Sequence, residues 1–288
     1  MTEHALQVCC AAEGEYVLHT AAMLDSVMFQ TEGRAHIHFL HGPGLPHPAA
    51  ALLQRVVDAG GGRITFHEIA PSRLAGLPVV EQFTAAMWYR IFLPDLLPNV
   101  DRVLYLDSDT IVADSLSPLW EIDLGDNYLG AVTNIFQRNH LQRPAELGLS
   151  GPGVYFNSGV LLMNLDLMRR DDCGAALCSY ARAHAHELEW PDQDALNVML
   201  GTRRLELHPR WNVMNSMFAF GAARRVFGRG ALRDARRNPA IRHFEGPAGN
   251  KPWEPDSDVP LRELYIRHRV RLTSSVLDRQ AAGVIDAA

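Results

Sequence analysis

Lysine is almost absent from this sequence. Its 288 residues include 27 basic residues, of which 26 are arginines and one is a lysine, Lys251. With 33 acidic residues the formal net charge is −6, which argues against a general nucleic-acid binder, because such proteins are basic overall. Because every other basic residue is an arginine, Lys251 is a candidate for a specific role.

Cysteines and long apolar runs are also scarce. The four cysteines, Cys9, Cys10, Cys173 and Cys178, do not have the spacing of a zinc site and are too few for a secreted disulfide scaffold. No stretch approaches the roughly 20 apolar residues that span a bilayer. Residues 1–6 lack the basic start and apolar run of a signal peptide. We therefore expect a soluble, reduced, cytoplasmic protein.

Apolar runs alternate with helical periodicities over the first hundred residues. Strands are expected at residues 5–12, 35–40, 63–69 and 102–106, and helices at residues 16–29, 48–59 and 82–93, the last ending at Pro94. This order predicts an α/β fold with a mostly parallel sheet and helices on both faces. Ligands of such sheets bind beyond the carboxyl ends of the strands.

The second half is less regular. The pattern predicts strands at 128–133 and 155–164, a long helix at 167–188, a shorter one at 192–200, and an arginine-rich, turn-rich stretch leading to a strand at 240–244. Without internal repeats or a long linker, one domain over residues 1–257 is expected. Residues 258–288 then form a basic C-terminal helix and tail.

Charge is unevenly distributed along the chain. Residues 101–126 hold seven carboxylates and one arginine, whereas residues 203–242 hold ten arginines and two acids. Charge alone favours two solvated surface patches. The alternative is a single site in which metal-binding carboxylates and cations surround a polyanionic substrate.

Two aspartates follow the buried strand expected at 102–106. In extended chain, residues two apart point the same way, so Asp107 and Asp109 can face one ion. Their hard oxygens suit Mg²⁺ or Mn²⁺ and leave room for substrate phosphates. An ordinary surface turn is the alternative for so short a motif.

Three further motifs could carry chemistry. His243 at a strand end could complete a carboxylate metal site, and the following Gly246 and Lys251 could approach phosphate oxygens. Asp192 and Gln193 suit sugar hydroxyls because they offer acceptors and a donor. The polar triplet 157–159 precedes an apolar run. The alternatives are a surface loop, a helix cap at Asp192 and a turn.

These motifs, in this order, resemble glycosyltransferase family eight over about residues 6–253. The family includes bacterial lipopolysaccharide galactosyl- and glucosyltransferases. The resemblance implies a GT-A-type fold, UDP-galactose or UDP-glucose as donor, Mn²⁺ with Mg²⁺ as the alternative, and retention of configuration. It also implies a glycan or glycolipid acceptor in cell-envelope synthesis, with a location in the cytoplasm or peripherally at the inner membrane face.

The resemblance also assigns roles to residues. Asp107, Asp109 and His243 match the metal ligands. The donor positions are Ala11, Glu13, Tyr16, Arg90, Ser108, Asn157, Gly246 and Lys251, and the sugar-contacting positions include Asp192 and Gln193. Since an amide is a poor nucleophile, we favour front-face attack by the acceptor with Gln193 stabilising positive charge. Asp192 or Asp194 as nucleophile is the alternative.

The sequence departs from the family pattern in two places. Glu13 and Glu15 stand where aspartate and often asparagine are usual, and Lys251 lies eight residues after His243 instead of six. Two other functions remain open. Residues 107–111 resemble the nucleophile motif of haloacid-dehalogenase-type phosphatases, and a non-catalytic UDP-sugar binding module would use the same donor residues.

Overall fold

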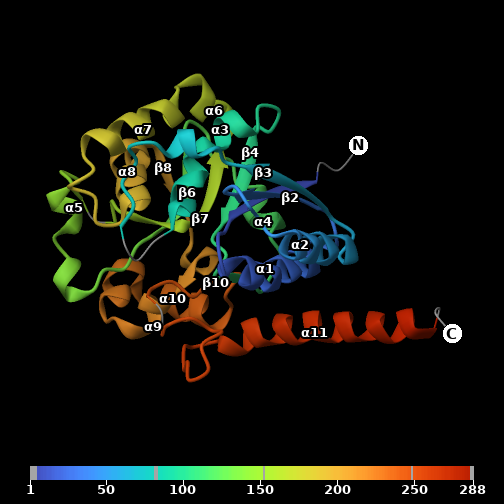
Figure 1. Cartoon of the computed structure of the whole chain (residues 1–288). Coiled ribbons are helices and arrows are strands. Elements are labelled where there is room, and N and C mark those ends of the chain that lie inside the picture. Colours follow the sequence, from blue (N-terminus) through green and yellow to red (C-terminus); the bar gives the residue numbers. More distant parts are fainter. Residues whose placement is uncertain (1–4, 81–83, 152, 248, 286–288) are drawn as a thin grey trace.

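A seven-stranded sheet forms the centre of the molecule in a computed structural model that describes residues 5–80, 84–151, 153–247 and 249–285, with side chains as far as residue 273. Its strands are β1 (Leu6–Ala11), β2 (Ala35–His41), β3 (Arg63–Glu68), β4 (Arg102–Leu106), β6 (Leu129–Thr133), β7 (Phe156–Asn164) and β8 (Arg204–Glu206). Their order is β3-β2-β1-β4-β7-β6-β8 (Figure 1). Only β7 runs antiparallel to its neighbours β4 and β6. The mostly parallel mixed sheet is confirmed.

Helices cover both faces of this sheet. The longer ones are α1 (Tyr16–Thr31), α2 (His47–Ala59), α7 (Cys173–Ala183), α8 (Pro191–Leu200), α10 (Ala222–Arg237) and α11 (Arg262–Ile285). Short α-helical segments are α3 (Leu93–Leu96), α4 (Ser117–Trp120), α5 (Arg143–Glu146), α6 (Leu165–Arg170) and α9 (Asn215–Ala219). The 3₁₀ segments are η1 (Pro71–Leu74), η2 (Ala85–Phe92), η3 (Arg138–His140), η4 (Gly201–Arg203) and η5 (Pro209–Trp211).

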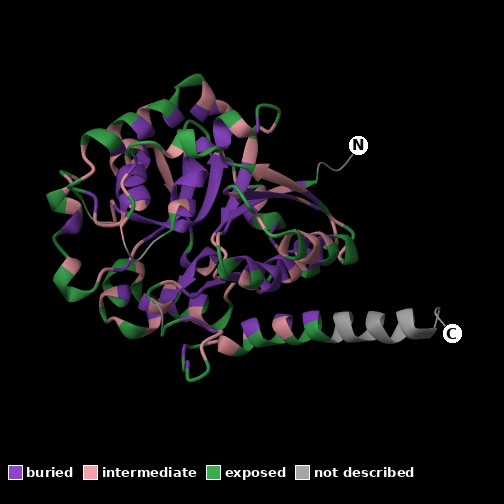
Figure 2. Ribbon diagram, viewed as in Figure 1, coloured by how far each residue is buried: buried purple, intermediate pink, exposed green. Residues whose placement is uncertain are grey.

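Two hydrophobic cores lie on opposite faces of the sheet. Successive strand residues point to opposite faces, so Val8 and Cys10 of β1 pack with α1 and α2, whereas Cys9 packs with η2 and α8. Figure 2 shows the central strands almost wholly buried between exposed outer helix surfaces. The four cysteines are all buried and free. Burial on both faces explains why these strands read as continuous apolar runs.

A second, three-stranded sheet places a histidine beside the end of β4. It consists of β5 (Thr110–Val112), β10 (Ile241–His243) and β9 (Val213–Met214), with β10 in the middle. β10 is antiparallel to β5, and His243 is opposite Thr110. Residues more than a hundred positions apart in the sequence are thereby brought together.

The segment before β4 differs from the expected helix at 82–93. Its residues 82 and 83 lie outside the described part, and the chain from residue 85 forms the 3₁₀ segment η2 followed by α3. Pro94 does not end the helical structure. It lies in the first turn of α3, where the missing proline N–H has no helical partner to lose.

The expected long helix at 167–188 is also wrong. The chain forms α6 and α7 instead, separated by Asp172 in a left-handed conformation with φ 51°. Asn164 caps α6 by accepting a hydrogen bond from Leu167 N at 3.0 Å. The apolar period continues across the break, so periodicity alone does not reveal it.

The arginine-rich stretch after residue 201 contains more regular structure than expected. It includes β8 and the sixteen-residue α10, which is kinked at Gly228 with φ 72° and ψ 166°. Three glycines in and beside α10 hid its helical pattern from the sequence, because glycine favours turns.

The basic C-terminal helix predicted within residues 258–288 is present as α11, which packs on α1 (Figure 1). Tyr265 Oη lies 2.8 Å from His19 Nδ1, and His268 and Arg271 both contact Asp25, at 2.6 and 3.1 Å. None of the described helices combines the length and apolarity needed to cross a membrane.

Candidate active site

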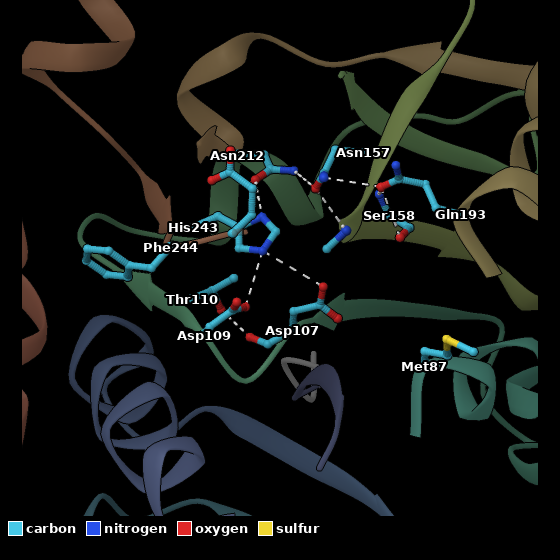
Figure 3. Close-up of polar contacts among 12 residues, drawn as sticks. Met87, Asp107, Asp109, Thr110, Asn157, Ser158, Gln193, Asn212, His243 and Phe244 are labelled. Atoms are coloured by element: carbon cyan, nitrogen blue, oxygen red, sulfur yellow. Dashed lines mark hydrogen bonds and ion pairs between the residues drawn. The ribbon is translucent and has the colours of Figure 1, made fainter. Parts of the chain in front are cut away.

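Two carboxylates and an imidazole converge at the carboxyl end of β4. Ligand atoms of Asp107, Asp109 and His243 all lie within 4.8 Å of one another, and no second such group occurs among the described residues (Figure 3). Asp107 N donates to Gly159 O at 2.8 Å, and Thr110 N and Oγ1 donate to Asp107 O at 3.1 and 2.7 Å. The turn is thus fixed by hydrogen bonds within itself and by one to β7. The structure brings together the three residues expected to be metal ligands.

The imidazole of His243 is held in an orientation that suits a metal ligand. Its Nδ1 lies 3.0 Å from Asn212 Oδ1, so Nδ1 carries the proton and Nε2 faces Asp109 Oδ1 at 3.2 Å. Burial lowers the pKa of His243, but Asp109 and Asp107 outweigh burial and raise it. Two hard oxygens and one oriented imidazole form a donor set that fits Mn²⁺ or Mg²⁺.

The single lysine lies against this cluster. Lys251 Nζ donates to Asp109 Oδ2 at 2.5 Å and to Phe244 O at 3.0 Å. Burial alone would raise the pKa of Asp109, but Lys251 and His243 hold it well below its usual range. Lys251 Nζ is also 6.0 Å from the ring centre of Tyr16, one of the expected donor residues.

Gly159 lies where no side chain fits. A Cβ atom built on Gly159 would be 2.2 Å from His243 Cε1 and 2.8 Å from Asp107 Oδ2. Contacts of that length force a neighbour to move. The sequence offered residues 157–159 as a motif that could carry chemistry or as a turn, and it gave Gly159 itself no role. The structure shows that the close approach of β7 and β10 depends on this glycine.

Arg90 connects the carboxylate cluster to the next group of polar residues. From η2 its Nη2 donates to Asp107 Oδ1 at 2.9 Å, and its Nε lies 3.3 Å from Asp192 Oδ2. The guanidinium also stacks over Tyr105, 4.2 Å from the ring centre. These contacts hold a buried cation between the expected metal site and the expected sugar site.

A chain of amides links His243 to Gln193 (Figure 3). Asn212 Nδ2 donates to Asn157 Oδ1 at 2.8 Å, and Asn157 Nδ2 donates to Gln193 Oε1 at 3.2 Å. Gln193 Oε1 also accepts from Ser158 N at 2.9 Å. Asn212, which is fully buried, was missed from the sequence, where it stands between short elements with no motif around it.

Asp192 and Asp194 have different surroundings. Asp192 is within the first turn of α8 and is not its cap, because the cap position is Trp190. Asp194 is fully buried, and both its oxygens accept hydrogen bonds, among them Tyr155 Oη and Arg143 Nη2, each at 2.5 Å. These bonds give Asp194 a structural role at the start of α8.

Two of the expected donor positions, Ala11 and Glu13, lie at the end of β1 and just after it. Ala11 ends the strand, and Glu13 accepts a hydrogen bond from Tyr89 Oη. Gly42 leaves room for this pair, since a Cβ there would be 2.7 Å from Glu13 Oε1. The remaining expected donor positions are Ser108, between the two aspartates, and the exposed Gly246, whose φ of 109° favours glycine.

The arginine-rich stretch does not surround the acidic one. Within the described chain, Arg210 is its one member that pairs with a carboxylate of residues 101–126, reaching Asp114 at 2.5 Å. Arg242 is fully buried and donates to backbone carbonyls, including Val213 O at 2.7 Å. The cations at the candidate site are instead Arg90 and Lys251.

The burial of Asp192 leads to a prediction about pH. Burial raises the pKa of Asp192 to about 6, against the opposing pull of Arg90. Because the pKa of Asp192 is higher in the folded state than in the unfolded state, its contribution to the unfolding free energy is fully present below about pH 4. That contribution is lost as the pH rises through about 6. We expect the metal-free wild type to lose about 2 kcal/mol of unfolding free energy between about pH 4 and pH 7 relative to Asp192→Asn. Urea unfolding at both pH values measures this, and parallel pH profiles would contradict it.

Sequence comparisons match this chain to a glycosyltransferase family and to several of its relatives. The family model described as Glycosyl transferase family 8 matches residues 7–257. General stress protein A of Bacillus subtilis is 28% identical over 273 residues, covering 92% of this chain and 93% of that protein. Lipopolysaccharide 1,2-glucosyltransferase of Escherichia coli is 31% identical over 156 residues, covering 53% of this chain and 45% of the relative.

Solved structures of glycosyltransferases also match most of this chain. The crystal structure of galactosyltransferase LgtC in complex with donor and acceptor sugar analogs has a TM-score of 0.82 at 30% identity and covers 93% of this chain and 96% of that chain. Glycosyltransferase GlyE of Streptococcus pneumoniae has a TM-score of 0.71 at 25% identity, covering 96% of this chain and 64% of that chain.

Proposed function

The chain belongs to glycosyl transferase family 8, and from that premise we propose that it transfers galactose or glucose from a UDP-sugar to a glycan or glycolipid acceptor with retention of configuration. The observation that carries the proposal is the convergence of Asp107, Asp109 and His243 with Lys251 at the carboxyl end of β4. In this proposal residues 1–257 form the catalytic unit and residues 258–288 an appendage.

The leaving group is a nucleoside diphosphate, and the site offers positive charge for it. A divalent cation held by Asp107, Asp109 and His243 would supply Lewis acidity toward the diphosphate oxygens. Lys251 is buried, and Asp109 raises its pKa against the effect of burial, so its ammonium group stays charged. Preorganised donors of this kind typically lower a barrier by about 3–4 kcal/mol.

In this proposal the other side of the reacting sugar would face the amide chain that includes Gln193. Gln193 Oε1 is fixed by Ser158 N and Asn157, so its dipole needs little reorganisation when positive charge develops on the sugar. Asp194 is engaged by Tyr155 and Arg143, which disfavours it as a nucleophile. Asp192 is paired with Arg90. We therefore retain front-face attack by the acceptor, with Gln193 stabilising the transition state.

The base and the biological setting complete the proposal. Tyr16 and Glu13, near the end of β1, would contact the uracil, with Glu13 held by Tyr89. The lipopolysaccharide glucosyltransferase among the relatives supports an acceptor of the cell envelope. Such an acceptor would be met in the cytoplasm or at the inner face of the membrane.

Release of UDP tests the proposal. Protein incubated with Mn²⁺ and UDP-galactose or UDP-glucose should release UDP slowly by hydrolysis and faster with an acceptor, and chelation by EDTA should stop it. Donor binding without UDP release would favour the non-catalytic binding module. Phosphate release from a simple phosphomonoester that is lost in Asp107→Asn would favour the phosphatase. If the protein neither bound the donor nor released UDP, sugar transfer would be contradicted.

A further inference from the structure

A hollow lies between α9 and α10, outside the candidate active site. Its volume is about 590 Å³. The two helices lie next to each other, on the side of the molecule that carries β10 (Figure 1). Five of the ten lining residues are arginines: Arg224, Arg229, Arg233, Arg236 and Arg237. None of the lining residues is acidic.

These arginines lack counter-charges in the described protein. None of the five forms an ion pair with a carboxylate among the residues whose contacts are described. Arg236 Nη2 donates to Met217 O, while Arg236 Nε is buried without a hydrogen-bond partner in the same described set. Five like charges around one hollow repel one another, so an anion in it would be stabilised.

The backbone of α10 creates this concentration of charge. The non-helical Gly228 divides α10, so Arg224 from the first half and Arg229 and Arg233 from the second line one hollow. Arg229 and Arg233 are four residues apart and therefore lie on one helix face. Phe218 and Phe220 supply apolar surface beside them.

Hydrogen bonds connect the helix that borders the hollow, α9, to the segment that carries the metal ligand His243. Glu245, two residues after His243, accepts hydrogen bonds from the backbone of Asn215 and from Ser216 N, the latter at 2.9 Å, and so fixes the start of α9. The other end of α9 contributes Phe218 and Ala219 to the hollow. A helix of five residues spans only about 7.5 Å, comparable to one or two sugar units.

We propose that this hollow binds a phosphoryl or pyrophosphoryl group carried by the acceptor, so that the enzyme acts on anionic acceptors. The inference rests on the proposed function for the word acceptor, while the anion site rests on the hollow itself. Guanidinium groups bind phosphate oxygens through paired N–H donors, which a set of lysines would not reproduce. The abundance of arginine in residues 203–242 thereby acquires a role.

Binding of inorganic pyrophosphate tests the site. Metal-free protein with excess UDP is titrated calorimetrically as wild type, as Arg229→Gln/Arg233→Gln and as Arg225→Gln/Arg267→Gln. The last variant removes the same charge from exposed positions that do not line the hollow. We expect affinity to fall about tenfold or more in the first double variant and less than about twofold in the control.

UDP release separates this proposal from the proposed function. Hydrolysis of the UDP-sugar without acceptor should be equal in all three proteins. Equal pyrophosphate binding in all three would overturn the anion site whatever the UDP release. If UDP release were absent but pyrophosphate affinity still fell about tenfold in Arg229→Gln/Arg233→Gln, the proposed function would be contradicted and the anion site would be supported.

Vesicles identify the source of the anion. Co-sedimentation with phosphatidylcholine vesicles, with and without phosphatidylglycerol, is compared for wild type and Arg229→Gln/Arg233→Gln. Loss of phosphatidylglycerol-dependent binding in the variant supports a lipid-borne phosphoryl group, and unchanged binding supports a soluble phosphorylated acceptor.

Discussion

Asp109→Asn is expected to lower the rate of sugar transfer by about a thousandfold or more, and to weaken Mn²⁺ binding by more than about a hundredfold. Asparagine keeps the shape of the side chain but removes the charge that faces His243 Nε2 at 3.2 Å and Lys251 Nζ at 2.5 Å. The variant also leaves Lys251 buried without its carboxylate partner. Steady-state UDP release and metal titration measure the two effects.

A matched control separates this effect from loss of surface charge. Asp126→Asn makes the same chemical change at an exposed position of the acidic stretch and should retain wild-type turnover and metal affinity. Circular dichroism of both variants would show whether the fold is intact. A folded Asp109→Asn variant with nearly wild-type turnover would contradict a role for this carboxylate.

Gly159→Ala is expected to reduce transfer by about a hundredfold or more, although it adds a single methyl group. The new Cβ would be 2.2 Å from His243 Cε1, so the imidazole or β7 must move. Such overpacking typically costs about 1–3 kcal/mol of stability. A shift of the imidazole also disturbs its bond to Asn212, and lost outer contacts of a metal ligand typically cost about 10- to 100-fold in metal affinity.

Gly130→Ala provides the comparison for Gly159→Ala. Gly130 is also in the central sheet, but a Cβ there meets the flexible end of Leu207 at 3.1 Å, away from the metal ligands. This control should lose some stability and keep Mn²⁺ affinity. If Gly159→Ala bound Mn²⁺ as tightly as Gly130→Ala and turned over at the same rate, the proposed geometry at His243 would be wrong.

The sequence predicted the first half of the fold well because its strands are buried on both faces. Buried parallel strands appear as short apolar runs, and the helices between them keep a clear apolar period. The predicted helices were wrong where local backbone geometry, and not the apolar pattern, decides the structure. Examples are the 3₁₀ path of η2, the left-handed Asp172 that separates α6 from α7, and the glycines of α10.

The residues of the candidate site that stand in short sequence motifs were predictable from the sequence. Asp107 and Asp109 are two residues apart in sequence, and His243 was proposed from its place at a strand end and from the resemblance to a family. Asn212 and the close approach at Gly159 depend on how β7, β9 and β10 pack, which no local pattern encodes. The cluster of arginines was visible as composition, but its arrangement around a hollow depends on the kink at Gly228.

The central claim is that Asp107, Asp109 and His243 hold a divalent cation used with the UDP-sugar. Titration of Mn²⁺ in the presence of UDP, followed by the electron paramagnetic resonance signal of free Mn²⁺, tests it directly. We predict one tightly bound Mn²⁺ in wild type and in Asp126→Asn, and affinity more than about a hundredfold weaker in Asp109→Asn. Equal Mn²⁺ affinity in wild type and folded Asp109→Asn would contradict the account.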